Sequence, residues 1–256
     1  MNRQHWGGLP EPVREVICRK VNGVVRAEPV VGGSARVALA VATESGHRVF
    51  VKGVRDEPRA RIECRVQRYL PALAPRLLWH AEVGDFLLMG FEYAEGRHSD
   101  LSPGSPDLVT MAATLAELAS WECPDLPVLP VEKRWAHCAD GPDSLATITG
   151  SALVHADLTA ENVIIGDRPW VVDWAWPSRG APWLDAAAMV ARLIQAGHEP
   201  AEAEAWAASV PAWRAAPPAA IGAYARLRAS LAAARGAPIA HAWRRYLSYL
   251  EGERNL

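Results

Sequence analysis

The sequence is short of cysteine pairs, long apolar runs and charge of one sign, and each shortage excludes a class of function. Its four cysteines form no C-x-x-C pair, which argues against a zinc or dithiol centre and favours separate thiols in a reducing compartment. A formal net charge of −2 over 256 residues gives no basic field for nucleic acid. No run approaches the roughly 18–20 apolar residues of a membrane span. We therefore expect neither nucleic acid nor a membrane as a partner.

The remaining composition is that of an ordinary globular protein. The hydrophobic share of 50% and the charged share of 22% are typical of such proteins, and the length suffices for one large domain or two small ones. The first residues, MNRQHWGGLPEPVREV, lack the apolar core of a signal peptide. We therefore expect a cytoplasmic protein.

The first third of the chain indicates a small sheet with one helix. Gly32, Gly33 and Ser34 predict a turn that leads into alternating apolar residues. The segment RVFVKGV alternates again and places Lys52 on a strand. After Pro58, a suitable first-turn residue, apolar side chains recur at helical spacing.

The chain becomes helical after a connector. FLLMGFEY, over 86–93, predicts another strand, and the Gly-, Pro- and Ser-rich residues 94–107 predict a connector between two lobes. The segment DLVTMAATLAELASW predicts a helix with Asp107 as its N-cap. Further helices are expected over 184–197, 201–209, 217–234 and 239–250.

Four polar residues interrupt the otherwise apolar stretch LVHADLTAENVIIGDRPWVVDW, over 153–174. Two short apolar strands joined by a Gly-Asp-Arg-Pro turn predict a hairpin. Asn162 precedes this hairpin and Asp173 follows it, so their oxygens can be aimed at one point, while Asp157 lies one loop away. Carboxylate and amide oxygens are ligands suited to Mg²⁺.

Phosphoryl transfer from a nucleotide requires this kind of residue set. It needs a cation on the phosphates, oxygen ligands for Mg²⁺ and a carboxylate near the acceptor hydroxyl. Lys52 can supply the cation, and Glu63 on the following helix can pair with it. Asp157 can accept the hydroxyl proton, while Asn162 and Asp173 can hold Mg²⁺.

One run carries a family resemblance. This run resembles the H-x-D-x-x-x-x-N catalytic loop of kinases, and it reads His155-Ala156-Asp157-Leu158-Thr159-Ala160-Glu161-Asn162. With Asp173-Trp174 downstream, the region is similar to the aminoglycoside phosphotransferase and choline kinase group, a phosphotransferase family with a kinase-like fold. The likeness spans roughly residues 28–195 and is strongest over 153–190.

The resemblance implies an α+β, two-lobed protein-kinase-like fold. Residues 1–94 would form a small β-rich nucleotide-binding lobe with the hinge at its end, and residues 95–256 a larger, mostly helical catalytic and acceptor-binding lobe. The implied activity is a small-molecule kinase with Mg²⁺. It would transfer the γ-phosphate of ATP, with GTP as the alternative, to a hydroxyl of a small-molecule acceptor. The acceptor and the oligomeric state stay open.

The resemblance also assigns roles to residues. Asp157 would be the catalytic base with His155 as an orienting neighbour, and Asn162 and Asp173 would hold Mg²⁺. Lys52 would contact the nucleotide phosphates, held in place by Glu63. The rest of the nucleotide site would comprise the phosphate loop Gly32, Gly33 and Ser34 and, at the adenine-binding hinge, Glu92 and Ala94.

Three positions bear on how well the family pattern applies. The family usually has His-Gly-Asp where this chain has Ala156, and a positive φ there would cost about 1 kcal/mol. The loop that begins at Gly32 is not a G-x-G-x-x-G sequence. Asp185, in PWLDAA, matches a family aspartate that braces the catalytic loop, so we expect a structural role for it.

Simpler interpretations accompany these roles. Lys52 could be an edge lysine facing water, and Glu63 could lie on a solvated helix face. The tryptophans near the catalytic loop are expected mostly in the core, with one available as a stacking wall. The acidic residues after 196 are too few to form the carboxylate cluster that a polycation needs: Glu199, Glu202, Glu204, Glu251 and Glu253.

Two other functions compete with the small-molecule kinase. A catalytically inactive, kinase-like module that binds nucleotide or a partner is motivated by Ala156 and the short phosphate loop. A protein kinase is less favoured, because no activation segment ending in A-P-E separates Asp173 from Asp185.

Overall fold

The computed structural model describes residues 5–30, 35–55, 57–139 and 141–253. The chain forms two compact units. The first comprises Met1–Arg97 and Ile164–Ala175, and the second comprises His98–Val163 and Trp176–Leu256. The chain therefore returns to the first unit for one short segment, and this segment carries Asp173.

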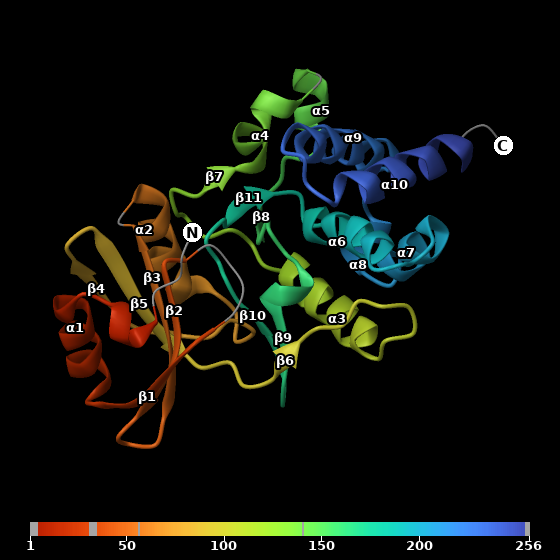
Figure 1. The fold of residues 1–256 in the computed structure, drawn as a ribbon. Coiled ribbons are helices and arrows are strands. Elements are labelled where there is room, and N and C mark those ends of the chain that lie inside the picture. The colour runs from red at the N-terminus through yellow and green to blue at the C-terminus, as the bar shows by residue number, and fades with distance from the viewer. Residues whose placement is uncertain (1–4, 31–34, 56, 140, 254–256) are drawn as a thin grey trace. The chain divides into compact units, whose positions relative to one another are not determined.

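The first unit is built on a five-stranded antiparallel sheet (Figure 1). Its strands, in spatial order, are β1 (Val24–Pro29), β2 (Val37–Thr43), β3 (Arg48–Arg55), β5 (Phe86–Glu92) and β4 (Leu77–Val83). The strands expected from the alternation in RVFVKGV and FLLMGFEY are the two central ones. Lys52 therefore lies on a central strand, paired with Ala38 on one side and Met89 on the other.

Two helices supply the apolar contacts of this sheet. Helix α1 (Glu11–Val21) contributes Val13, Ile17 and Val21 to a buried cluster that includes Leu88 of β5. A second cluster contains Leu87, Met89 and Phe91 from the same strand, together with Ala60 of helix α2 (Pro58–Val66). Because neighbouring residues of a strand point to opposite faces, the two clusters lie on the two faces of the sheet.

Helix α2 is shorter than its apolar spacing suggests. It ends at Val66 and continues as a 3₁₀ turn over Gln67–Tyr69. Leu70 then adopts an extended conformation, with ψ 150°. The residue before a proline is disfavoured in the helical region, and Pro71 therefore ends the helix.

The predicted hairpin is present and begins at the point where the chain enters the first unit. Its strands are β9 (Val163–Ile165) and β10 (Pro169–Val171). At the turn, the Gly166 N–H donates to the carbonyl of Arg168 over 3.2 Å. A Cβ added to Gly166 would lie 2.1 Å from the carbonyl oxygen of Glu95, so only glycine fits this close approach.

The second unit combines a small sheet with most of the helices (Figure 1). The sheet has the order β7 (Leu129–Pro130), β11 (Ser178–Gly180) and β8 (Ala152–Val154). The helices are α3 (Asp107–Ala119), α4 (Val131–Arg134), α5 (Pro142–Ala146), α6 (Leu184–Gln195), α7 (Pro200–Ala207), α8 (Pro211–Arg214), α9 (Pro218–Ala234) and α10 (Ala240–Glu253). Its short elements are β6 (Arg97–His98), which starts at the unit boundary, and the 3₁₀ turns η3 (Ala136–Cys138) and η4 (Ala160–Asn162), while the 3₁₀ turn η1 (Trp6–Gly8) belongs to the first unit.

An aromatic cluster forms part of the core of the second unit. The ring of Tyr224 lies 5.6 Å from that of Trp135, 5.7 Å from Trp183 and 5.9 Å from Trp243. Tyr224 comes from α9 and Trp243 from α10, and both are about 1% exposed. Aromatic pairs at these distances add specific attraction to the burial of apolar area.

Three smaller expectations can be compared with the structure. The prediction of Asp107 as an N-cap is wrong: Pro106 is the N-cap, and Asp107 instead accepts the Asp100 N–H over 2.8 Å. All four cysteines are half-buried free thiols, as expected. Among the helices of the described residues, none combines the length and the apolar character that crossing a bilayer requires.

Candidate active site

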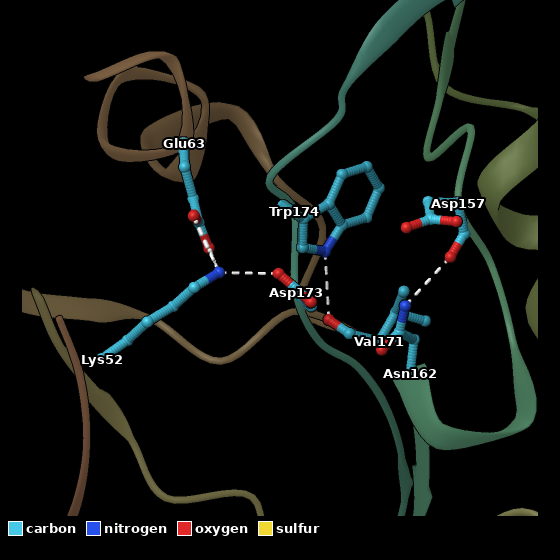
Figure 2. Close-up of polar contacts among 7 residues, drawn as sticks. All are labelled: Lys52, Glu63, Asp157, Asn162, Val171, Asp173 and Trp174. Atoms are coloured by element: carbon cyan, nitrogen blue, oxygen red, sulfur yellow. Dashed lines mark hydrogen bonds and ion pairs between the residues drawn. The ribbon is translucent and has the colours of Figure 1, made fainter. Parts of the chain in front are cut away.

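A buried lysine of the first unit contacts two carboxylates (Figure 2). The Nζ atom of Lys52 lies 2.8 and 2.9 Å from the two carboxylate oxygens of Glu63. The same atom lies 2.6 Å from Oδ1 of Asp173. Lys52 is only 7% exposed and Glu63 only 2%, which excludes an edge lysine and a solvated glutamate. The structure thus brings three of the predicted site residues together.

The strand register explains why these side chains meet. On β3, Phe50 and Val54 pack in the cluster that also contains Ala60 of α2. Lys52 lies between them at the two-residue spacing of a strand, so it points to the same face. Glu63 lies on α2, three residues beyond Ala60, and reaches the lysine from the helix.

The electrostatics favour a charged Lys52. Burial opposes the ammonium form, but the carboxylates of Glu63 and Asp173 outweigh it and raise the pKa of Lys52 above its ordinary value. The ammonium group is therefore present at neutral pH and held in one position. A fixed cation of this kind can contact a phosphate group without first being ordered.

Asp173 has an uncommon backbone conformation. Its φ is 62°, in the left-handed region that asparagine and aspartate tolerate better than most residues. The next residue, Trp174, is buried, and its indole N–H donates to the carbonyl of Val171 over 3.0 Å (Figure 2). This bond fixes the chain directly after β10, while the side chain of Asp173 keeps an exposed fraction of 36%.

In the second unit, one buried aspartate holds the backbone of the predicted catalytic loop. Oδ2 of Asp185 accepts the His155 N–H over 2.8 Å, and Oδ1 accepts the Ala156 N–H over 3.0 Å. Burial raises the pKa of Asp185, while His155 and these two N–H groups oppose the increase. Asp185 therefore has the bracing contact that the resemblance implies.

Two further contacts order the residues around Asp157. His155 is fully buried, and its Nδ1 accepts the backbone N–H of Asp157 over 3.4 Å. The side-chain amide of Asn162 donates to the backbone carbonyl of Asp157 over 2.9 Å (Figure 2). Asn162 uses its nitrogen in this bond, so its amide oxygen can serve as a ligand. The loop is therefore fixed at both ends, with Asp157 between.

Ala156 is strained in the way that its departure from the family pattern predicts. Its φ is 65°, in the left-handed region that glycine adopts without strain and where a Cβ clashes with the backbone. Asp185 holds this peptide in place by accepting its N–H. The loop therefore holds Ala156 in a conformation that glycine adopts more readily, at a cost in stability.

Replacing Ala156 by glycine should raise the free energy of unfolding by about 0.5–1 kcal/mol. Relief of roughly 1–2 kcal/mol of strain is partly offset by the greater freedom of glycine in the unfolded chain. Denaturant unfolding measures the change. The matched control is Ala233→Gly on the exposed face of α9, which should cost about 1 kcal/mol. Equal losses in both variants would disprove strain at Ala156.

The remaining predicted residues have separate positions. Glu92 ends β5, and its carboxylate lies 3.4 Å from Nε of Arg76. Ala94 follows β5 in an irregular segment. The predicted phosphate loop lies outside the described residues: Gly32, Gly33 and Ser34. Their roles stay predictions.

The tryptophans near the loop divide into two kinds. Trp174 and Trp183 are buried, at 1% and 4% exposed, and belong to the core. Trp176 is 36% exposed, with the guanidinium of Arg134 at 4.9 Å from its ring. Of the three, Trp176 is therefore the one that keeps a substantial exposed surface, with a guanidinium group over its ring.

The ligand chemistry available for a metal ion is limited to hard oxygens. Among the described residues, no group of three or more His, Cys, Asp and Glu side chains could hold a metal ion. Asn162 of the second unit offers an amide oxygen, and Asp173 of the first unit offers a partly exposed carboxylate. Each is a hard oxygen of the kind that Mg²⁺ accepts beside its waters and phosphate ligands.

The sequence reasoning missed one charged residue near the loop. Arg192 lies on α6, seven residues after Asp185. Burial lowers its pKa, as does the charge of Arg228, whereas Asp157 and Glu161 act in the opposite direction. The signal was present, because residues seven apart share a helix face and Asp185 had already been assigned to the loop.

Comparisons with known proteins support the fold. No family model matches the sequence, and no curated protein matches it significantly. The structure is similar to that of the GDP complex of wild-type aminoglycoside 2'-phosphotransferase-IIIa, with 11% identity and a TM-score of 0.59, covering 96% of this chain and 100% of that one. It is also similar to aminoglycoside phosphotransferase APH(3'')-Id from Streptomyces rimosus ATCC10970 in complex with ADP and streptomycin, with 16% identity and a TM-score of 0.58, covering 86% and 98%. The predicted kinase-like α+β fold, of the aminoglycoside phosphotransferase type, is confirmed.

Proposed function

We propose that this chain is a small-molecule kinase that transfers the γ-phosphate of a nucleoside triphosphate to an alcohol. The observation that carries the proposal is the buried Lys52, held by Glu63 and in contact with Asp173, in a fold of this type. Phosphoryl transfer depends on positioning and charge stabilisation, and a buried, fixed cation beside a carboxylate supplies both. We place the reaction in the cytoplasm.

The nucleotide site is proposed within residues 1–94. Lys52 would donate to phosphate oxygens, while Glu63 keeps the ammonium group in position. Backbone groups of Glu92 and Ala94 would hydrogen-bond the base, and Gly32, Gly33 and Ser34 would approach the phosphates. The similar solved structures contain GDP in one case and ADP in another, which supports a nucleotide as the donor. We expect ATP, with GTP as the alternative.

Asn162 and Asp173 would hold Mg²⁺. When bound, Mg²⁺ neutralises charge that develops on the phosphate oxygens. Asp173 suits this role because its carboxylate is partly exposed and one of its oxygens already forms an ion pair with the ammonium group of Lys52. The side-chain amide nitrogen of Asn162 donates a hydrogen bond to the backbone carbonyl of Asp157, and this bond orients the amide oxygen of Asn162.

Asp157 would accept the proton of the acceptor hydroxyl in the catalytic lobe, residues 95–256. His155 and Asp185 act as positioning residues, because their contacts are with the loop backbone. A general base must be held within hydrogen-bond reach of the proton that it removes. The loop contacts supply this constraint before any acceptor binds.

The test is formation of ADP that depends on an added acceptor. The purified chain, with Mg²⁺ and ATP, is screened against alcohols of different charge, and ADP is measured. ADP formation that requires one of them supports the kinase and excludes an inactive nucleotide-binding module. Nucleotide binding with no acceptor-dependent ADP across neutral, anionic and cationic alcohols would favour the inactive module instead. Phosphate transfer to protein substrates alone would favour a protein kinase.

A further inference from the structure

The segment of residues 92–96, at the end of β5 in the first unit, contains the proposed base-binding residues. Within it, Ala94 is half-buried, and no hydrogen bond joins its backbone N–H or carbonyl to another residue that the structure describes. Buried backbone groups are nearly always paired, so partly covered groups without a protein partner are available to water or to a ligand. The backbone of Ala94 therefore has one donor and one acceptor to offer.

One arginine contacts the residues on both sides of Ala94. Nη1 of Arg48 donates to both carboxylate oxygens of Glu95, each at 2.8 Å. The guanidinium carbon of Arg48 lies 3.7 Å from the centre of the Tyr93 ring. A guanidinium group that both stacks on an aromatic ring and bonds to a carboxylate has a fixed orientation. Arg48 thus links Tyr93 to Glu95, with Ala94 between them.

The strand register explains why Arg48 reaches this segment. Arg48 is the first residue of β3, and the next residue, Val49, pairs with Glu92 at the end of β5. In an antiparallel pair, the residue before Val49 faces the residue after Glu92, which is Tyr93. The arginine therefore extends the β3–β5 contact by its side chain, at the point where the backbone ladder ends.

Other contacts hold the two ends of the segment. The Glu92 N–H donates to the carbonyl of Arg76 over 2.9 Å, and the Glu92 carboxylate forms an ion pair with the Arg76 side chain. At the other end, a Cβ added to Gly96 would clash with the carbonyl oxygen of Ile165, so the segment packs closely against the β9–β10 hairpin. The sheet and the hairpin thus fix the ends, and Arg48 fixes the middle.

We propose that Arg48 is a positioning residue for the nucleobase, which holds Ala94 so that its backbone N–H and carbonyl can hydrogen-bond the base. The inference rests on the proposed function for its nucleotide and adds a residue to it. The ion pair itself contributes little to folding, because the side chains of Arg48 and Glu95 are 40% and 63% exposed. Its contribution is to affinity, since a segment that is ordered in advance loses less conformational freedom when the base binds.

A comparison of nucleotides with inorganic tripolyphosphate tests this role. All these ligands carry the triphosphate that Lys52 would contact, but only ATP and GTP have a base. Their Kd values with Mg²⁺ are measured for the wild type and Arg48→Met by titration calorimetry. If the released segment adopts the binding conformation about a tenth of the time, the Kd of the preferred nucleotide increases roughly tenfold. The Kd of tripolyphosphate should not change, whereas a general structural defect would weaken both.

Matched variants assign the effect to the contacts of Arg48. Glu95→Gln removes the carboxylate and should also weaken nucleotide binding. Arg48→Lys keeps the charge without the planar stack and should give an intermediate Kd. Arg61→Met is the control, because the Arg61–Glu82 pair has a similar exposure, 45% and 57%, and joins α2 to β4. It should bind nucleotide as the wild type does.

Two further measurements exclude a merely structural role. Without ligand, the Tm of Arg48→Met should stay close to that of the wild type, because an exposed ion pair is lost. With the acceptor found by the ADP screen, Arg48→Met should raise KM for the nucleotide and leave kcat unchanged, as expected for a contact that orders the bound base alone. A fall in kcat with an unchanged KM would contradict the proposal.

The outcomes separate this inference from the proposed function. An unchanged nucleotide Kd in Arg48→Met, or equal losses for nucleotide and tripolyphosphate, would overturn the inference and leave the kinase in place. Wild-type binding of ATP and GTP that is no tighter than that of tripolyphosphate would overturn it as well, because the base would then contribute nothing. Nucleotide binding that depends on Arg48, without acceptor-dependent ADP formation, would support the inference and remove only the phosphate transfer.

Discussion

Replacing Asp157 by asparagine should lower kcat by roughly 10³-fold and leave nucleotide binding intact. The change removes the carboxylate that would take the hydroxyl proton, and general bases typically contribute about 10²–10⁴-fold. The backbone of the loop should be preserved, because its contacts come from Asp185, His155 and Asn162 and not from the Asp157 side chain. The measurements are kcat with the acceptor found by the ADP screen, and the Tm shift with Mg²⁺ and ATP.

The control for this variant is Asp167→Asn. Asp167 lies exposed in the hairpin turn, and its Oδ1 accepts the N–H of Arg168 over 3.0 Å, a contact that asparagine can keep. Its kcat should equal that of the wild type. Turnover by Asp157→Asn at the rate of the wild type would remove Asp157 as the base. Loss of the nucleotide shift in the same variant would show a structural defect in place of a chemical one.

Removing the Lys52 cation should cost about 3–5 kcal/mol of folding free energy. Lys52→Met removes the Lys52 ammonium group from the buried Glu63 carboxylate, and breaking one partner of a buried pair is costly. The double variant Lys52→Met/Glu63→Leu should recover most of this loss, because a buried ion pair can often be replaced by apolar residues at little cost. Urea unfolding of the two variants and the wild type measures both effects.

A surface ion pair on the same helix gives the comparison. Arg61 of α2 pairs with Glu82 at 2.9 Å, with side chains 45% and 57% exposed. Arg61→Met should cost no more than about 1 kcal/mol, as for most exposed pairs. If Lys52→Met cost as little as Arg61→Met, the Lys52–Glu63 pair would have no structural importance. Both Lys52 variants should lose the nucleotide-dependent Tm shift.

The kinase-like fold and the main residues of the candidate site could be predicted because their signals are local. The spacing from His155 to Asn162 lies within one loop, and the alternation around Lys52 lies within one strand. The observed φ of Ala156 follows from its place in that loop pattern. By contrast, the sequence reasoning did not identify helix α1. Its N-cap is Pro10, so no capping side chain marks its start. Strands β1 and β4 were missed as well.

The features that could not be predicted depend on contacts between distant segments. Helices α6 and α9 are distant in the sequence, and nothing in either segment indicates that the two helices contact each other. Asp107 appeared to be an N-cap because of its position, but it bonds back to the connector at Asp100. The left-handed φ of Asp173 follows from the chain path after β10, which Trp174 fixes through Val171. Each of these depends on tertiary structure that overrides a local preference.

Thermal unfolding with Mg²⁺ and ATP or GTP, for the wild type and Asp173→Asn, tests the central claim most directly. Asparagine tolerates the φ of 62° at this position, so the variant removes the charge and keeps the backbone. Nucleotide at about a hundred times its Kd should stabilise the wild type by roughly 2.7 kcal/mol. The account predicts a magnesium-dependent increase in Tm that Asp173→Asn abolishes. No increase with either nucleotide, or the same increase in both proteins, would contradict it.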